Sequence, residues 1–289
     1  MGTSTARRTA SDVTDIDLVL SGSGTLAPAH LGAAMRLVAL GMRPVRVAGT
    51  SGGAIVAAAL AFGMDHKRAL KIAVDVLDGE LLDPVPWWKP WEAVTRFGVY
   101  RFDRIRERIA REFPGTMGNS SMPWGVFVVD LETRSPVFIS SMDHPEVSVA
   151  DAVTASASIP VFAQARRIGG LRGLFVDGGA AVNFGMGVWD DTPERPTVGV
   201  RFGSSGPSVR QPVENPVEYA HALARVFIKN ANKTHISTKR YADVIRIRTA
   251  GSGLDFSMTQ EQVCLLLADG ARAVDRWVER RGGLPLSDP

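Results

Sequence analysis

Two short apolar segments near the beginning of the chain each lead into a glycine-rich turn and then into a helical pattern. Residues 16–20 precede the sequence SGSG at 21–24, and residues 45–48 precede the sequence GTSGG at 49–53. Strands that alternate with helices predict a parallel sheet covered by helices, because two parallel strands need a connection long enough to hold a helix. This alternation places the chain in the α/β class.

Further strands and helices continue the pattern along the chain. Apolar periodicity predicts strands at residues 126–131, 137–140, 174–176, 197–202 and 244–247. It predicts helices near residues 31–41, 54–62, 67–77, 102–113, 149–158, 217–230 and 260–278. A chain of 289 residues has the length of one large α/β domain, so we expect a disordered leader at residues 1–14 and a single domain at residues 15–289.

Charge and cysteine content exclude several classes of protein. The chain has 33 basic and 30 acidic residues, and its net charge of +3 is not that of a nucleic-acid-binding protein with a dense basic stripe. Cys264 is the only cysteine, which excludes an intramolecular disulfide and a cysteine-based zinc site. The longest purely apolar run, residues 54–62, is far shorter than the ~20 residues of a membrane span. No signal-peptide pattern follows the polar beginning of the chain, so we expect a cytoplasmic protein, soluble or peripheral at a membrane.

The GTSGG turn at residues 49–53 fits the pattern G-x-S-x-G. Such a turn between a strand and a helix holds the serine in a strained conformation, and the flanking glycines leave room for it. The serine oxygen is then exposed at the carboxyl edge of the sheet, beside a helix N-terminus whose dipole favours negative charge. We therefore expect Ser51 to be a nucleophile, with Gly49 and Gly53 supporting the turn. The alternative is a tight strand–helix turn in which Ser51 only caps the helix.

A serine nucleophile needs a base, for which the sequence offers histidines and an aspartate. His221 and His235 follow the serine, but both lie in a helical, basic segment rather than in a loop after a strand. Asp177 follows an expected strand and precedes Gly178 and Gly179, which allow the backbone to bring its carboxylate close to a site at the sheet edge. A carboxylate that burial desolvates has a raised pKa and can serve as the base, so Asp177 is the better candidate for this role. The alternative is an ordinary Asp-Gly turn.

The first glycine-rich turn supplies backbone N–H groups. Acyl transfer develops an oxyanion, and such groups are suitable donors to it, so we expect Gly22, Ser23 and Gly24 to form an oxyanion hole. The alternative is a phosphate cradle for a dinucleotide, since Ala27 completes a tolerable match to G-x-G-x-x-G. That match lacks an acidic residue at the end of a second strand, and the P-loop lysine is also missing. We therefore expect neither a cofactor nor a metal ion.

Taken in this order, the three motifs resemble those of the bacterial type of the patatin-like phospholipase family. The family pattern is a glycine-rich oxyanion loop, then G-x-S-x-G, then D-G-[GA], and the resemblance extends over about residues 16–185. The sequence AHLG at 29–32, the sequence ASASIP at 155–160 and Asn183 also resemble family segments.

The resemblance implies a fold, a mechanism and a substrate class. The implied fold has three layers, with a mostly parallel central sheet and helices on both faces. The implied mechanism is a dyad of Ser51 and Asp177 without histidine. The implied function is that of a lipid acyl hydrolase, of phospholipase A or lysophospholipase type, which cleaves acyl esters of phospholipids or other acyl lipids.

The oxyanion loop departs from the family pattern G-G-G-x-[RK]-G. Ser23 replaces the middle glycine, Leu26 stands at the cationic position, and Ala27 replaces the last glycine. The proline-containing turn that is common after the family's asparagine is also absent, because Phe184 and Gly185 follow Asn183. Backbone donors remain, but the cationic side chain is lost. The alternative function is a catalytically weak or inactive protein of the same fold that binds lipid or a partner protein.

Residues 84–100 are dense in proline and aromatic side chains, and Trp87, Trp88 and Trp91 fall close together within them. Tryptophan favours the headgroup region of a membrane, so one hypothesis is that these side chains contact a membrane surface. The arginines that follow could then meet lipid phosphates: Arg101, Arg104, Arg106, Arg108 and Arg111. The alternative is that the aromatics cap the core and the arginines form a solvated helix face. Both hold if the segment is a lid over the site.

Overall fold

The computed structural model of the protein describes residues 13–76, 78–192, 194–203, 212–215, 218–220, 222–223, 226, 243–249 and 253–282. The strands are β1 (Thr14–Leu20), β2 (Met42–Thr50), β3 (Gly98–Tyr100), β4 (Trp124–Asp130), β5 (Ser135–Ser140), β6 (Val161–Ala163), β7 (Phe175–Asp177), β8 (Thr197–Phe202) and β9 (Val244–Ile247). The helices are α1 (Ala27–Ala39), α2 (Gly52–Ala61), α3 (His66–Asp75), α4 (Pro90–Thr95), α5 (Asp103–Glu112), α6 (Val149–Ala157) and α8 (Gln260–Arg280). Within the described residues every expected strand and helix is present, with limits that differ by a few residues. Most of the expected helix at 217–230, like residues 1–12 of the expected leader, lies outside them.

Within the described residues the main sheet has seven strands, in the order β5-β4-β2-β1-β8-β9, with β7 also paired to β4. β1 runs parallel to β2 and β8, β2 runs parallel to β4, and β8 runs parallel to β9. β5 and β7 run antiparallel to β4, so the sheet is mixed but mostly parallel. Leu20 of β1 pairs with Gly49 of β2, which brings both glycine-rich turns to one edge of the sheet.

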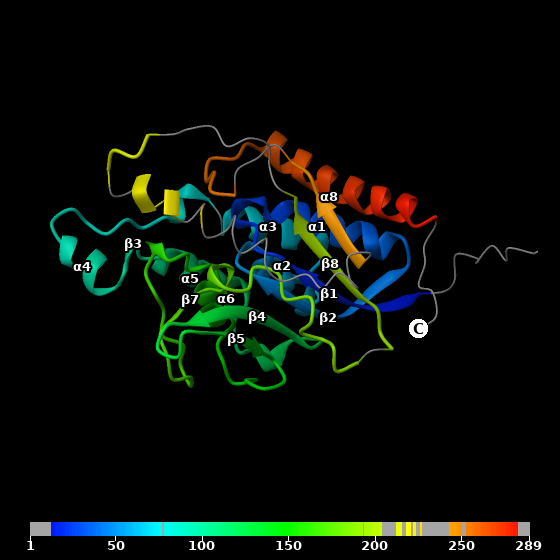
Figure 1. The fold of residues 1–289 in the computed structure, drawn as a ribbon, viewed down its shortest axis with the longest axis horizontal. Helices are drawn as coiled ribbons and strands as arrows, with labels where there is room; N and C mark the ends of the chain where they lie inside the picture. The colour runs from blue at the N-terminus through cyan, green and yellow to red at the C-terminus, as the bar shows by residue number, and fades with distance from the viewer. Residues whose placement is uncertain are drawn as a thin grey trace, which may run out of the picture.

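Helices α1, α2 and α8 hold the first glycine-rich turn against the sheet. α2 is apolar and almost wholly buried, as its Ala-rich sequence predicts. Figure 1 shows α8, in orange to red, lying along α1. The two helices pack closely, because a Cβ atom on Gly32 would lie 2.1 Å from the Leu267 carbonyl oxygen and one on Gly270 would lie 2.0 Å from that of Ala29. This contact fixes the beginning of α1, and the turn before it, in place.

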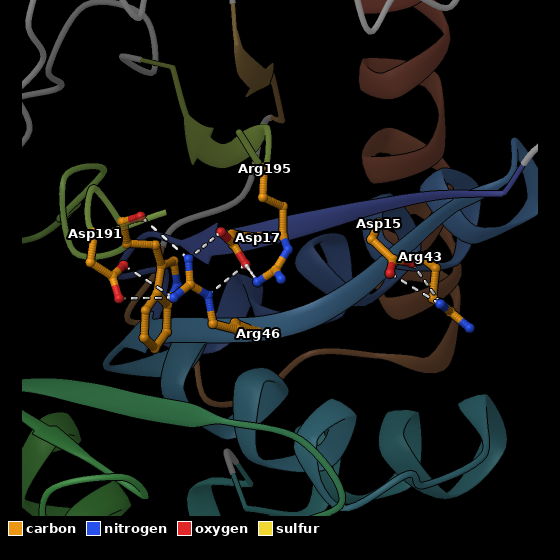
Figure 2. Close-up of polar contacts among 7 residues, drawn as sticks. Asp15, Asp17, Arg43, Arg46, Asp191 and Arg195 are labelled. Atoms are coloured by element: carbon orange, nitrogen blue, oxygen red, sulfur yellow. Dashed lines mark hydrogen bonds and ion pairs between the residues drawn. The ribbon is translucent and has the colours of Figure 1, made fainter. Parts of the chain in front are cut away.

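Asp17 on β1 and Arg46 on β2 form a buried ion pair between the two central strands (Figure 2). Arg46 donates from Nη2 to Oδ2 of Asp17 at 2.6 Å and from Nε to Oδ1 at 2.8 Å. Arg195 donates to the same aspartate at 3.3 Å, and Asp191 accepts from Arg46 at 3.1 Å. The guanidinium carbon of Arg46 lies 4.6 Å from the centre of the Trp189 ring. In the sequence Asp17 is only a break in an apolar segment, so the network was not predicted.

The segment that contains α4 and β3 forms a part of the fold that the sequence did not predict. β3 pairs in parallel with β6 in a separate two-stranded sheet. Trp87, Trp88 and Trp91 are 85%, 59% and 57% exposed, so the alternative that they cap the core is wrong. Among the described helices none is both long and apolar enough to cross a membrane.

The arginines after this segment are largely occupied by neighbouring groups. Three of them form ion pairs with acidic side chains: Arg101 with Glu92, Arg106 with Asp151, and Arg108 with Asp75 and Glu112. Ile105 and Ile109 of α5 face the core, as predicted. Arg106 and Arg108 of α5, and Arg101 before it, are therefore paired with neighbouring carboxylates rather than free to meet lipid phosphates.

Candidate active site

Ser51 lies at the turn between β2 and α2, in a strained backbone conformation. Its φ of 54° and ψ of −125° lie outside the regions that L-residues favour. The neighbouring chain leaves no room for side chains around it, because a Cβ atom on Gly49 would lie 2.4 Å from the Gly53 carbonyl oxygen. One on Gly53 would lie 2.4 Å from the Ser21 carbonyl oxygen. Strain of this kind costs on the order of 1–3 kcal/mol and is found at functional sites.

Asp177 is the last residue of β7, and the pairing of β2, β4 and β7 places it near Ser51. Thr50 of β2 pairs with Phe127 of β4, and the next residue of β4, Val128, pairs with Asp177. The Ser51 hydroxyl lies beside the buried Asp177 carboxyl, near enough to favour its charged form and lower its pKa. The antiparallel direction of β7 was not predicted, and it is this direction that places the end of the strand beside Ser51.

Burial raises the pKa of Asp177 to about 7, against the opposing effect of its two donors, Ser51 and Gly179. The Gly179 N–H donates to Oδ1 of Asp177 at 2.6 Å, from a short 3-10 helix that begins at Gly178. No cation among the described residues contributes to the shift. Asp177 is therefore a carboxyl group that gains and loses a proton near neutral pH, within reach of a serine hydroxyl.

The end of α6 braces both members of the pair. The Ser51 N–H donates to Oγ of Ser156 at 3.0 Å, and that hydroxyl donates to the Phe127 carbonyl at 2.8 Å. The Asp177 N–H donates to the Ser158 carbonyl at 2.8 Å. Ser156 and Ser158 had no predicted role beyond their place in a family-like segment, and their signal in the sequence is a Ser-x-Ser pattern shortly before a proline.

The turn at residues 21–24 lies against the beginning of α2. A Cβ atom on Gly52 would lie 2.3 Å from the Gly24 carbonyl oxygen and 2.5 Å from Oγ of Ser23, so only glycine fits there. The Gly22 N–H already donates to the Asn183 carbonyl at 3.0 Å. Within the described part of the chain, neither the Ser23 nor the Gly24 N–H has an acceptor. Of the three expected oxyanion donors, two are therefore available beside Ser51.

His30 supports the same turn from α1. Its Nε2–H donates to the Ser21 carbonyl at 2.8 Å, and its ring packs edge-on against Phe202 with centroids 5.0 Å apart. Burial lowers the pKa of His30 to about 4, so the ring is neutral at neutral pH. Its Nδ1 atom is buried without a partner among the described residues. This positioning role was not predicted, because an isolated histidine in a helix carries no such signal.

None of the three described histidines hydrogen-bonds to Ser51: His30, His66 and His144. The two other histidines that were weighed as a base, His221 and His235, lie outside the described residues. Leu26, which stands at the cationic position of the family loop, is buried in the main core. Among the described residues there is also no group of three His, Cys, Asp or Glu side chains that could hold a metal ion.

A narrow pocket opens beside Ser51 and is almost entirely apolar. Its apolar lining includes Ile55, Phe102, Ile105, Ile159, Leu254 and Phe256. The backbones of Gly24, Gly52 and Gly253 complete the wall nearest the serine. Its free volume is only about 20 Å³ in this structure, which is too small for an acyl chain, so its apolar walls would have to separate to admit one. Chemically, the site combines a hydroxyl, a titratable carboxyl, two N–H donors and an apolar pocket, as acyl transfer requires.

Comparison with known proteins gives a family match and one informative structural match. A family model described as patatin-like phospholipase matches residues 18–188, more than half of the chain. The uncharacterised protein YqhO of Bacillus subtilis is 28% identical over 92% of this chain and 98% of its own length. An uncharacterised NTE-family protein of Mycobacterium bovis is 35% identical over 58% of this chain, which is 27% of that protein. The crystal structure of VipD from Legionella pneumophila matches 96% of this chain and 72% of its own, with a TM-score of 0.53 and 16% identity, and so shares the fold.

Proposed function

Because the chain belongs to the patatin-like phospholipase family, we propose that it is a lipid acyl hydrolase that cleaves acyl esters through Ser51 and Asp177. The observation that carries this proposal is the position of the Ser51 hydroxyl beside the buried Asp177 carboxyl, whose pKa burial raises to about 7. Such a carboxylate can accept the proton of a serine as it attacks, without help from histidine. The proposed substrates are phospholipids or lysophospholipids, whose acyl chains match the apolar lining of the pocket beside Ser51.

In the first half of the proposed reaction, Oγ of Ser51 forms a bond to the ester carbonyl carbon while its proton passes to Asp177. The carbonyl oxygen becomes an oxyanion and accepts hydrogen bonds from the Ser23 and Gly24 N–H groups. The carbon–oxygen bond of the ester then breaks. Asp177 returns the proton to the leaving alcohol, and the acyl group remains on Ser51.

In the second half, water takes the place of the alcohol. The water oxygen forms a bond to the acyl carbon while a proton passes from the water to Asp177. The Ser23 and Gly24 N–H groups again donate hydrogen bonds to the oxyanion. The bond to Ser51 breaks, the proton returns from Asp177 to Oγ, and a fatty acid is released. The two halves use the same groups in opposite order, so one carboxyl that titrates near neutral pH serves both.

Ser51→Ala tests the proposal directly. Alanine fits the turn and removes only the oxygen, so we expect complete loss of hydrolysis of a chromogenic short-chain ester with an unchanged melting temperature. A fluorophosphonate probe is expected to label the wild-type protein at Ser51, which peptide mass spectrometry can verify. The matched control is Ser135→Ala, an exposed serine on β5, which is expected to keep full activity and labelling. Labelling at another serine, or activity retained by Ser51→Ala, would contradict the dyad.

Leu26 favours a second candidate function, a catalytically weak protein of the same fold that binds lipid or a partner protein. The family's cationic side chain is missing at this position, and no cation is among the described residues that line the pocket beside Ser51. The same ester assay separates the two candidates. Pure wild-type protein that is not labelled by the fluorophosphonate probe and has no turnover would support the binding function.

A further inference from the structure

Five large apolar side chains, which we call the aromatic tip, are exposed together around α4: Trp87, Trp88, Trp91, Val94 and Phe97. Their exposed fractions run from 57% for Trp91 to 85% for Trp87. Single exposed apolar residues are normal on a protein surface, but a contiguous group of this size marks an interaction surface. The other three tryptophans, Trp124, Trp189 and Trp277, are all buried.

The segment that carries the aromatic tip is held in place by the rest of the fold. The Val85 N–H donates to the Val99 carbonyl at 2.8 Å, and Glu92 accepts from Nε of Arg101 at 3.0 Å. Phe97 has a φ of 62°, a conformation that a bulky residue rarely adopts without support. The backbone is therefore fixed while the side chains are exposed, which is the arrangement of a surface built for contact.

The aromatic tip connects directly to the pocket of the proposed active site. β3 begins directly after the tip, and Phe102 follows it two residues later. β6, the partner of β3, begins two residues after Ile159. Phe102 and Ile159 both line the pocket. Figure 1 shows α4 at one end of the molecule, beyond β3 and α5. A surface that binds the tip would therefore lie close to the pocket wall.

The chemistry of the aromatic tip fits a lipid bilayer with anionic headgroups. Indole rings are apolar with one N–H donor and favour the headgroup region. Lys89 and Arg96 are exposed beside them. Lys89 shares Glu92, the one acid of this segment, with Arg101, so the segment keeps a net positive charge. A protein interface of standard size buries about 800 Å² per partner with matched shape, which a projecting helix of six residues is poorly suited to supply. A bilayer needs no matched shape.

We propose that the aromatic tip inserts into the headgroup region of an anionic phospholipid bilayer and so holds the pocket of Ser51 at the membrane surface. The binding step does not depend on catalysis. Only its consequence for lipid hydrolysis rests on the proposed function, so the test measures the two separately.

Binding is measured in the Ser51→Ala background, where hydrolysis cannot alter the vesicles. The Ser51→Ala protein, which is the parent in this series, is expected to cosediment with vesicles of phosphatidylcholine and phosphatidylglycerol. Trp87→Ala, Trp88→Ala and Trp91→Ala combined should weaken this binding by about tenfold or more, because buried apolar area supplies most of it. The matched control, Val38→Ala, Leu131→Ala and Met142→Ala combined, removes three exposed apolar side chains elsewhere and is expected to bind like the parent. Lys89→Gln with Arg96→Gln should cause a smaller loss and reduce the sensitivity to salt.

Intrinsic fluorescence identifies the surface that inserts. Because only the three tryptophans of the tip are exposed, vesicle binding is expected to shift the emission to shorter wavelength, and brominated acyl chains are expected to quench it. In the wild-type background, the triple tryptophan variant should keep its hydrolysis of a soluble ester within about twofold and its melting temperature.

Equal vesicle binding by the parent and the triple tryptophan variant would overturn the proposal. So would a wild-type protein that binds no vesicle, in which case a protein partner is the better interpretation of the tip. A wild-type protein that binds vesicles through the tip but hydrolyses no ester would support the docking surface and contradict the proposed function.

Discussion

Asp17 and Asp177 are both buried aspartates of the same sheet, yet they lie in opposite electrostatic surroundings. Asp17 accepts hydrogen bonds from two arginines, Arg46 and Arg195. Asp177 accepts from the Gly179 N–H and lies beside the Ser51 hydroxyl, and no cation among the described residues offsets its burial. A buried carboxylate that is paired with arginines serves structure, whereas one that is buried without a cation has a raised pKa and can transfer protons.

The two regions also differ in what they attach. The Asp17 network ties β1 and β2 to the segment between Asp177 and β8, through Arg46, Asp191 and Arg195 (Figure 2). Asp177 does not join separate segments by ion pairs in this way, and its own position is fixed by contacts with α6 and β4. The charged network thus fixes the chain that follows the titrating group. The comparison yields three predictions, which begin with the largest effect.

Asp177→Asn is expected to lower the turnover of a short-chain ester by about 10²–10⁴-fold, the usual contribution of a general base. Asparagine keeps the shape and still accepts from Gly179, but it cannot take the proton of Ser51. Steady-state kinetics on the purified variant measure the loss, and circular dichroism verifies the fold. His221→Ala and His235→Ala are the controls and should remain close to wild type. A histidine variant as inactive as Asp177→Asn would replace the dyad by a histidine-dependent triad.

Arg46→Ala is expected to destabilise the protein by about 3–5 kcal/mol, because it leaves Asp17 buried without its main partner. Urea unfolding measures this loss. The matched control is Arg43→Ala, which removes an ion pair to Asp15 between the same two strands but at an exposed position (Figure 2). Exposed pairs contribute little, so the control should unfold close to wild type. Equal effects of the two substitutions would mean that burial does not distinguish the two pairs.

Activity and stability are expected to change in opposite directions as Asp177 titrates. The base must be ionised, so kcat/KM on a soluble ester should fall by about tenfold per pH unit below pH 7 and level off above it. For stability, the pKa of Asp177 in the folded protein lies above the ordinary value of 3.8. Its contribution to stability is therefore complete below pH 3.8 and is lost as the pH rises to about 7.

Asp177→Asn separates this effect from other titrations. The variant carries no charge at the position, so its melting temperature should exceed that of the wild type at pH 8, and the difference should shrink towards pH 5. Calorimetry at the two pH values measures this difference. A wild-type protein that is more stable than the variant at pH 8 would contradict this prediction. It would mean that another group near Asp177 offsets the cost of burying its ionised carboxylate.

Much of the fold and part of the candidate site could be predicted from the sequence. Each expected strand and helix within the described residues is present, because apolar periodicity reports which side of an element is buried. The oxyanion loop was predicted less well. Gly22 was expected as a donor, but its N–H is occupied by the Asn183 carbonyl. That carbonyl comes from a distant part of the chain, so no local pattern could reveal the contact.

The sequence by itself determined the turn at Ser51, since a strand, a helix and flanking glycines at fixed spacing impose its conformation through short-range sterics. Only the tertiary structure decided what surrounds that serine. The pKa of Asp177 depends on burial and on the antiparallel pairing of β7 with β4, while the roles of Ser156 and His30 depend on single contacts between distant elements. The exposure of the tip tryptophans was equally undecided, because the same residues could have packed on the core. Steric limits act within a few residues, whereas desolvation and pairing depend on which segments meet, and that is settled only when the whole chain packs.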